Sequence, residues 1–134
     1  MSGFALVLFN AVNSERAQVG LPALAGNGCV VFVAQLRSDD MAARNYFSHE
    51  SPDGQTAFTL MTQYGVPYGW AGENIARNNY PNAETVGVTI RDLMQSAGHR
   101  ENILRTTFDR IGIGFAADAS GMKYFTMVFT GAPY

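Results

Sequence analysis

Two β-rich runs near the end of the chain constrain its fold more than any other feature. The runs "RIGIGFAA" (residues 110–117) and "KYFTMVFT" (residues 123–130) are separated by the short segment "DASG". Such runs around a polar, glycine-containing turn predict an antiparallel hairpin. Much of the remaining sequence has apolar residues at helical spacing, so we expect helices to enclose a small antiparallel sheet. The predicted fold class is therefore α+β, with helices and sheet in layers.

Helical segments are predicted where apolar residues recur at steps of three and four. They comprise residues 4–19, 30–45, 57–64 and 83–97. We expect Asn82 to cap the last of these segments and Gly98 to end it. Residues 68–76 contain two glycines, so an irregular strand is expected there instead.

Three side-chain placements follow from the same pattern. In the first helix, Val19 is expected on the buried face. In the second helix, the polar run from Arg37 to Asp40 is expected to face water. Cys29 has apolar neighbours, which favours a small buried side chain over a reactive nucleophile. Because it is the only cysteine, no internal disulfide can form.

Length and charge limit the function classes. The 134 residues suit a single domain, residues 1–134, which we expect to be a monomer. A formal charge of −2, without any lysine or arginine run, argues against nucleic acid as a partner. No apolar run reaches the roughly 20 residues of a transmembrane segment. One interpretation of residues 1–3 is that they replace a signal peptide that was trimmed.

Three side chains that could bind a metal or transfer a proton lie at the edges of predicted elements: His49, Glu73 and His99. Their spacings of 24 and 26 residues match no local metal motif. Small and apolar residues flank Glu73, so its carboxylate is expected to be partly buried and to need a partner, for which a histidine is a candidate. The simpler alternative is that each histidine caps a segment end, while Asn102 and Arg100 satisfy free backbone groups.

Several motifs follow one another in a fixed order along the chain. They are "NSERAQVGLPAL", "FSH", "SPDG", "AGENIA", "GHRENIL" and "RIGIG". In this order they resemble the CAP superfamily, which includes cysteine-rich secretory proteins, antigen 5, plant pathogenesis-related 1 proteins and bacterial SCP-like domains. The resemblance covers nearly the whole chain and implies a three-layer α-β-α sandwich with a shallow cleft, in an extracellular or cell-surface protein. With one cysteine instead of many disulfides, the chain resembles the minimal bacterial domains.

The resemblance also implies a site. In this family two histidines and two acidic residues line the cleft, and some members bind zinc or another divalent ion through the histidines. His49, Glu73 and His99 occupy the matching positions, and all three are candidate metal ligands, with Zn²⁺ the expected ion. The fourth position falls on Asp53 or Glu50, of which we prefer Asp53.

Three functions are compatible with these residues. The first is a secreted binding module whose cleft captures a small apolar ligand, a peptide or a cell-wall component, with a metal as an aid. Aromatic residues near the motifs favour it, namely Tyr46, Phe47, Tyr64, Tyr68, Trp70 and Tyr80. The second is a metal-dependent hydrolase or protease, in which Glu73 is a ligand or base and Asp53 a secondary acid. In the third, the polar cluster only stabilises the fold. We expect the first.

Overall fold

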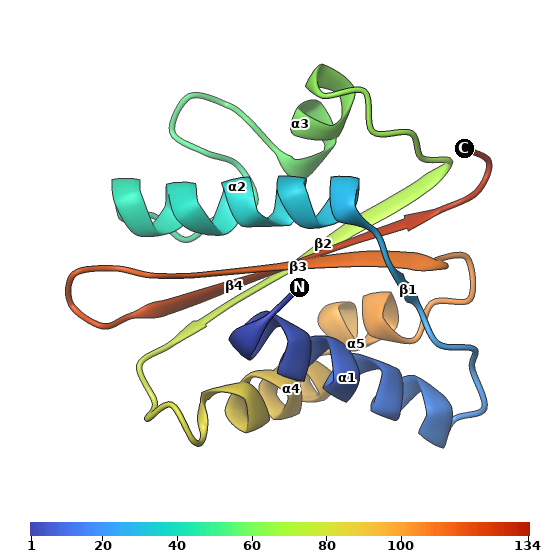
Figure 1. The fold of residues 1–134 in the computed structure, drawn as a ribbon, viewed down its shortest axis with the longest axis horizontal. Helices are drawn as coiled ribbons and strands as arrows, with labels where there is room; N and C mark the ends of the chain where they lie inside the picture. The colour runs from blue at the N-terminus through green and yellow to red at the C-terminus, as the bar shows by residue number, and fades with distance from the viewer.

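The computed structural model describes all 134 residues, which fold into three layers (Figure 1). A four-stranded sheet forms the middle layer, with helices α1, α4 and α5 on one face and α2 and α3 on the other (Figure 1). The helices span Gly3–Gln18 (α1), Gly28–Arg44 (α2), Ala57–Gln63 (α3), Thr85–Gln95 (α4) and Ala97–Ile103 (α5). None of them has the length and apolar character needed to cross a bilayer. The predicted three-layer α-β-α sandwich is confirmed.

The sheet has the strand order β1-β3-β4-β2. Its strands span Ala25–Gly26 (β1), Trp70–Asn78 (β2), Arg110–Ala117 (β3) and Lys123–Gly131 (β4). Strands β3 and β4 form the predicted hairpin, and β2 runs antiparallel to β4. The two-residue β1, however, pairs in parallel with β3. The sheet is therefore mixed rather than wholly antiparallel, because the segment after α1 runs along β3 in the same direction.

Strand β4 lies between β2 and β3 and is buried along almost its whole length. Phe125, Met127 and Phe129 share one core with residues of α1 and α4. Val128 shares a second core with Val30 of α2. Because successive side chains of a strand point to opposite faces, β4 fills the cores on both sides of the sheet. This explains why its sequence reads as a nearly continuous β-rich run.

Helix α2 lies directly on strand β3 at two glycines. A Cβ atom added at Gly112 would lie 2.2 Å from the backbone nitrogen of Val31. One added at Gly114 would lie 2.4 Å from the backbone oxygen of Ala34. A larger side chain at either position would push the helix away from the sheet, because packed interiors have no spare room. These glycines therefore set the distance between α2 and the sheet, and with it the position of each side chain that α2 directs inward.

The polar run of α2 does not face water as predicted. Arg37 and Ser38 are buried, and only Asp39 is fully exposed, with Asp40 half-buried. The hydroxyl oxygen of Ser38 lies 2.8 Å from that of Thr126 on β4. The rotation of α2 that buries its apolar residues also buries these two polar ones, and each finds a polar partner there.

Helix α4 is shorter at both ends than predicted. Its N-cap is Glu84 rather than Asn82, because the chain first forms a turn. At the other end, Ser96 has extended backbone angles (φ −99°, ψ 121°) and interrupts the helix. Gly98 then lies within α5 instead of ending α4. His99 is therefore part of a second, short helix that the sequence pattern did not predict.

Two apolar side chains predicted to be buried lie at the surface. Val19 is 55% exposed, because α1 ends at Gln18 and the chain turns away from the core. Cys29 is exposed in the first turn of α2, where Asn27 caps the helix and Val30 is the first buried residue. Its thiol is thus a surface group, and the prediction of a buried cysteine is wrong.

We predict that Gly114→Ala lowers the free energy of unfolding by about 1–3 kcal/mol, because the added methyl group meets the backbone of α2. The matched control is Gly87→Ala in α4, where nothing lies within 4 Å of an added Cβ. This control should raise the free energy of unfolding by about 1 kcal/mol, since alanine favours a helix more than glycine does. Urea denaturation measures both effects. Equal effects of the two substitutions would contradict the close approach of α2 to β3.

Candidate functional site

The carboxylate of Glu73 is the centre of the candidate site. Glu73 lies in β2, and its side chain is 3% exposed. Oε2 accepts a hydrogen bond from Nε of Arg37 at 3.0 Å, and Oε1 lies 2.7 Å from Nδ1 of His49. A buried carboxylate needs such partners because burial alone disfavours its charge. The prediction that Glu73 is buried and partnered by a histidine is confirmed.

Arg37 is the partner that sequence reasoning missed. Its side chain is 1% exposed and extends from α2. Nε donates to Glu73, and the two terminal nitrogens donate to the hydroxyl of Tyr46 and the carbonyl of Ser48. Burial opposes the positive charge, but the hydrogen bond and negative charge of Glu73 outweigh it and raise the pKa of Arg37. Arg37 therefore ties the segment that carries His49 to both α2 and β2.

The sequence does contain a signal for Arg37. The apolar stripe of α2 includes Val30, Val33 and Met41, and position 37 falls within this stripe at helical spacing. A charged residue inside an apolar stripe indicates a buried, paired charge. This signal predicts an acidic partner on the sheet, and Glu73 is that partner.

His49 presents its imidazole to solvent while one ring nitrogen is fixed. Its side chain is 59% exposed. Because an ionised carboxylate only accepts hydrogen bonds, Nδ1 of His49 donates to Glu73. Nε2 has no hydrogen-bond partner in the protein and is available to a ligand. The hydrogen bond and the charge of Glu73 raise the pKa of His49 above its ordinary value, against the effect of burial.

His99 approaches the same place from α5. Its Nδ1 lies 2.9 Å from the hydroxyl oxygen of Ser96, where α4 is followed by α5. Its carbonyl accepts a hydrogen bond from the side-chain nitrogen of Asn74 at 3.0 Å. Burial lowers the pKa of His99, and the charge of His49 lowers it further. The two imidazoles are therefore within electrostatic reach of each other and have pKa values shifted in opposite directions.

Polar side chains hold α5 in place. Asn102 donates to the carbonyl of Glu73 at 3.4 Å. Arg16 of α1 is 2% exposed and donates to the carbonyls of Ile103 and Arg105, each at 3.0 Å. The alternative that Asn102 satisfies a free backbone group is confirmed, whereas the side chain of Arg100 is exposed and makes no such bond. Arg16 and Ile103 are 87 positions apart in the sequence. No local sequence pattern therefore indicates that Arg16 anchors α5.

Asp53 and Glu50 lie outside this cluster. The carboxylate of Asp53 is 60% exposed and accepts hydrogen bonds from the hydroxyl of Ser51 at 2.6 Å and from Arg44 at 2.8 Å. The hydrogen bond from Ser51 and the pairing with Arg44 lower the pKa of Asp53 to about 2. Glu50 is exposed. Neither carboxylate is hydrogen-bonded to Glu73 or to an imidazole.

The cluster does not present a complete set of metal ligands. No three histidine, cysteine, aspartate or glutamate side chains lie together in a way that could hold an ion. Both oxygens of Glu73 are engaged: Oε2 accepts from Arg37, and Oε1 accepts from His49 and, at 3.5 Å, from Arg37 as well. A carboxylate behind a histidine is, however, the usual support for an imidazole ligand. The roles of His49, His99 and Glu73 as metal ligands, and of Glu73 and Asp53 in catalysis, stay predictions.

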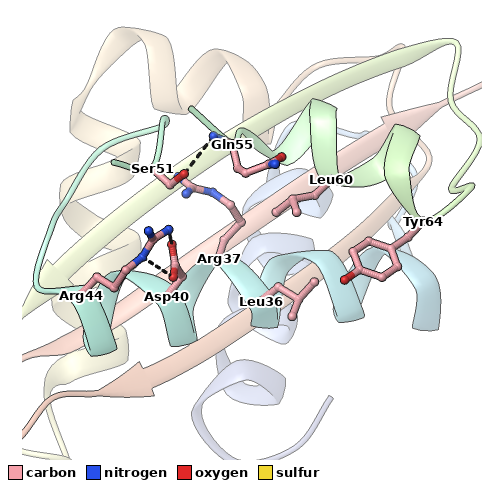
Figure 2. A pocket seen from close by; sticks show the side chains of 8 residues that line it. All are labelled: Leu36, Arg37, Asp40, Arg44, Ser51, Gln55, Leu60 and Tyr64. Atoms are coloured by element: carbon pink, nitrogen blue, oxygen red, sulfur yellow. Dashed lines mark hydrogen bonds and ion pairs between the residues drawn. The ribbon is translucent and has the colours of Figure 1, made fainter. Parts of the chain in front are cut away.

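A hollow of about 200 Å³ lies between α2 and α3 (Figure 2). It is lined by Leu36, Arg37, Asp40, Arg44, Ser51, Gln55, Leu60 and Tyr64. Its polar groups already have partners within the protein: Arg44 is paired with Asp40, and the hydroxyl of Ser51 accepts from the backbone of Gln55 (Figure 2). These groups have little hydrogen-bonding capacity left for a ligand.

A second hollow of about 270 Å³ runs beside β2, and we call it the β2 groove. It is lined by Phe47, Ile75, Ala76, Arg77, Asn78, Thr89, Asp92, Leu93, Ser96 and His99. Unlike the hollow between α2 and α3, this groove reaches an imidazole of the cluster. It is therefore the cavity most closely connected with the candidate site.

We predict that Glu73→Gln lowers the pKa of His49, because the group that chiefly raises it loses its charge. The same change should lower the free energy of unfolding by about 3–5 kcal/mol, since Arg37 is left buried without a counter-charge. Histidine ring signals in an NMR titration report the pKa. Asp53→Asn is the control and should leave the pKa of His49 unchanged. An unaltered pKa in Glu73→Gln would show that the contact does not exist in solution.

The opposite pKa shifts predict opposite pH dependences of stability. His49 has a raised pKa in the folded state, so its contribution is present below the unfolded value near 6.5 and lost as the pH rises through the folded value. His99 has a lowered pKa, so stability is lost as the pH falls below 6.5. On acidification from about pH 8 to about pH 5.5, His99→Gln should therefore gain stability relative to His49→Gln. Thermal unfolding of both variants measures this, and identical pH profiles would refute it.

Known proteins share both the sequence and the fold of this chain. The sequence model of CAP, described as the cysteine-rich secretory protein family, matches residues 9–129. The Bacillus subtilis (strain 168) protein YkwD is 35% identical over 120 residues, which cover 90% of this chain and 45% of YkwD. An extracellular protein containing a SCP domain, from Bacillus anthracis str. Ames, is 32% identical, with a TM-score of 0.84 over 97% of this chain and 41% of that protein.

A third similar protein, solved as NaASP2 with Zn²⁺, has the same fold, with 15% identity and a TM-score of 0.67 over 96% of this chain and 80% of that one. The chain spans less than half the length of the two Bacillus relatives, at 45% and 41%. With a family match over residues 9–129, which is most of the sequence, the chain belongs to the CAP family of cysteine-rich secretory proteins.

Proposed function

We propose that the chain is a ligand-binding domain of an extracellular bacterial protein, and that its cleft binds a divalent metal ion through His49 and His99. The observation that carries this proposal is the exposed imidazole of His49, which a buried, Arg37-paired carboxylate holds in place. A buried ion pair contributes little to stability compared with apolar side chains of similar size. The arrangement therefore fits a positioning role better than a purely stabilising one. The extracellular relative from Bacillus anthracis supports the setting.

Two features of the imidazoles support Zn²⁺ as the ion. Imidazole nitrogen is a preferred ligand of zinc. Each ring has Nδ1 bonded to a neighbouring side chain, which leaves Nε2 as the ligand atom. Glu73 then acts behind His49, orienting the ring and raising its basicity, rather than binding the ion itself. NaASP2 with Zn²⁺ has the same fold, which supports an ion in a domain of this kind. When bound, the ion supplies a Lewis acid for an anionic or carbonyl group of the ligand.

A metal-dependent hydrolase or protease is supported less well by the same residues. Such an enzyme needs a carboxylate that is free to take a proton from water. Glu73 is engaged by Arg37 and His49, and Asp53 is engaged by Arg44. Neither candidate base is therefore free, and we favour binding over hydrolysis.

The lining of the β2 groove favours a peptide over a purely apolar ligand. Of the six aromatic residues near the motifs, only Phe47 lines this groove. Trp70 and Tyr80 are exposed and do not line it, and Tyr64 lines the hollow between α2 and α3. The groove combines a few apolar side chains with several polar ones, which suits a chain that carries both kinds of group.

We predict that the parent protein takes up zinc and that His49→Ala/His99→Ala abolishes the heat of binding, because both ligand atoms are removed. Isothermal titration with zinc chloride measures this. Asp53→Asn is the matched control and should bind zinc like the parent. Ser96→Ala should weaken binding by about tenfold, because the ring of His99 loses its support. Zinc heat that persists unchanged in the double variant would refute the proposed site.

A further inference from the structure

Strand β2 forms one edge of the sheet and pairs only with β4. Alternate residues of a strand direct their main-chain groups to opposite sides. The carbonyl of Gly131 on β4 accepts a hydrogen bond on the β2 side, so Gly131 and every second residue before it face β2. Their partners include Ala76 and Asn78. Ile75 and Arg77 therefore direct their N–H and C=O groups away from β4, to the open edge.

The other edge of the sheet shows how this protein closes a strand. The side-chain amide of Gln35 donates to the carbonyl of Phe115 at 2.7 Å and accepts from its N–H at 3.1 Å. On β2, a side chain covers the outward main chain only at Glu73, whose carbonyl accepts from Asn102. The next two outward-facing residues, Ile75 and Arg77, have no such side-chain partner. No hydrogen bond engages their main-chain groups. Unpaired edges of this kind are templates for another extended chain.

The β2 groove runs along this open edge. Residues 75–78 of β2 form its base. Thr89 and Leu93 of α4 contribute to one side, Phe47 forms the other, and His99 lies at one end. The groove therefore lies beside β2, between α4 and the segment that carries Phe47. An extended chain in the groove would lie beside β2, in line with the sheet.

The uncompensated charge of the groove is positive. The guanidinium of Arg77 lies 4.7 Å from the ring centroid of Phe47 and has no ion-pair partner. On the opposite side, Asp92 is already paired with Arg91. A ligand with a carboxylate would thus complement the Phe47 side of the groove.

We propose that the β2 groove binds an extended acidic peptide, which adds to the sheet as a fifth strand beside β2. The N–H and C=O groups of Ile75 and Arg77 supply the main-chain hydrogen bonds, and a carboxylate side chain of the peptide pairs with the guanidinium of Arg77. In strand addition of this kind, main-chain hydrogen bonds provide the affinity, and the alternate side chains of the peptide provide the specificity. This proposal rests on the proposed function, in which the cleft binds a ligand. It adds the chemical class of that ligand.

Side-chain direction explains why an acidic residue is required. Side chains directly opposite each other on neighbouring strands point to the same face of the sheet. Arg77 points toward the α2 layer, where it contacts Phe47. A peptide residue opposite Arg77 therefore points to this face as well, and a glutamate or aspartate there meets the unpaired guanidinium. The alternate peptide residues point toward Leu93 of α4, where an apolar side chain fits.

The probe for the first test is a capped five-residue peptide of alternating valine and glutamate, added to ¹⁵N-labelled protein. We expect the amide signals of Ile75 and Arg77 to shift and their hydrogen exchange to slow. The amides of Ala76 and Asn78 should change little, since they already pair with β4. Protection confined to any other part of the chain would overturn the proposal.

Two N-methylated versions of the probe separate strand pairing from simple charge attraction. Methyl groups on one alternate set of amides block the donors that face β2, whereas methyl groups on the other set point away. One version should lose affinity by about tenfold or more, and the other should bind like the unmodified peptide. Equal binding by both versions would overturn strand addition without altering any residue of the protein.

The role of the Arg77 charge in peptide binding is tested with Arg77→Ala. This substitution keeps the main-chain donor but removes the guanidinium. Affinity for the probe should fall by about two- to fivefold, while the amide of Ile75 stays protected. Arg110→Ala is the matched control and should bind like the parent, since the guanidinium of Arg110 also lies over an aromatic ring, that of Tyr134, but Arg110 does not line the groove. A probe with lysine in place of glutamate should bind more weakly. Equal affinity for the lysine probe would overturn the assignment of an acidic ligand.

Two measurements separate this proposal from its alternatives. Failure of the parent protein to take up zinc, while the peptide still protects Ile75 and Arg77, contradicts only the proposed metal site. Loss of protection with retained zinc binding in the parent contradicts only strand addition. Sedimentation of the peptide-free protein should show a monomer. Self-association that protects Ile75 and Arg77 without peptide would identify a second copy as the occupant and overturn the peptide.

Discussion

The buried ion pair between Arg37 and Glu73 connects two layers of the molecule and fixes the exposed imidazole beside it. Arg37 comes from the helix on one face of the sheet, and Glu73 comes from an edge strand. Each charge is stable in the interior only because the other is present. The remaining donors of Arg37 hold Tyr46 and Ser48, so the segment leading to His49 is fixed by the same guanidinium. Without Arg37, the carbonyl of Ser48 and the hydroxyl of Tyr46 would each lose a donor.

The rest of the fold keeps this pair at the correct distance and brings a second imidazole to it. The glycines of β3 let α2 lie directly on the sheet, which places Arg37 within reach of β2. On the opposite layer, Arg16 and Asn102 hold α5, and α5 carries His99. Each imidazole is therefore positioned by different elements of the fold, and the charge of His49 lowers the pKa of His99. The open edge of β2 continues from this point, so the metal-binding and peptide-binding proposals concern neighbouring parts of one cleft.

The layers could be predicted from sequence because hairpins and amphipathic helices are local patterns. His49 and Glu73 could be predicted as a set from their motifs and from the expected burial of the carboxylate. Arg37 could not be placed correctly while its charge was taken as a sign of exposure, although its position within the apolar stripe of α2 indicated burial. Helix α5 was missed because Gly98 is a stronger local breaker than Ser96, whereas long-range bonds from Arg16 decide the outcome. Errors of this kind arise where tertiary partners outweigh local propensity.

A double-mutant cycle between Arg37→Met and Glu73→Gln, read by urea denaturation at neutral pH, tests the central claim most directly. If the two side chains form a buried pair that connects the layers, each single substitution leaves an unpaired buried group that the double variant largely removes. We predict a coupling free energy of about 2–3 kcal/mol between the two positions. Effects that add to within about 0.5 kcal/mol would show that the two residues act independently, and would contradict this account.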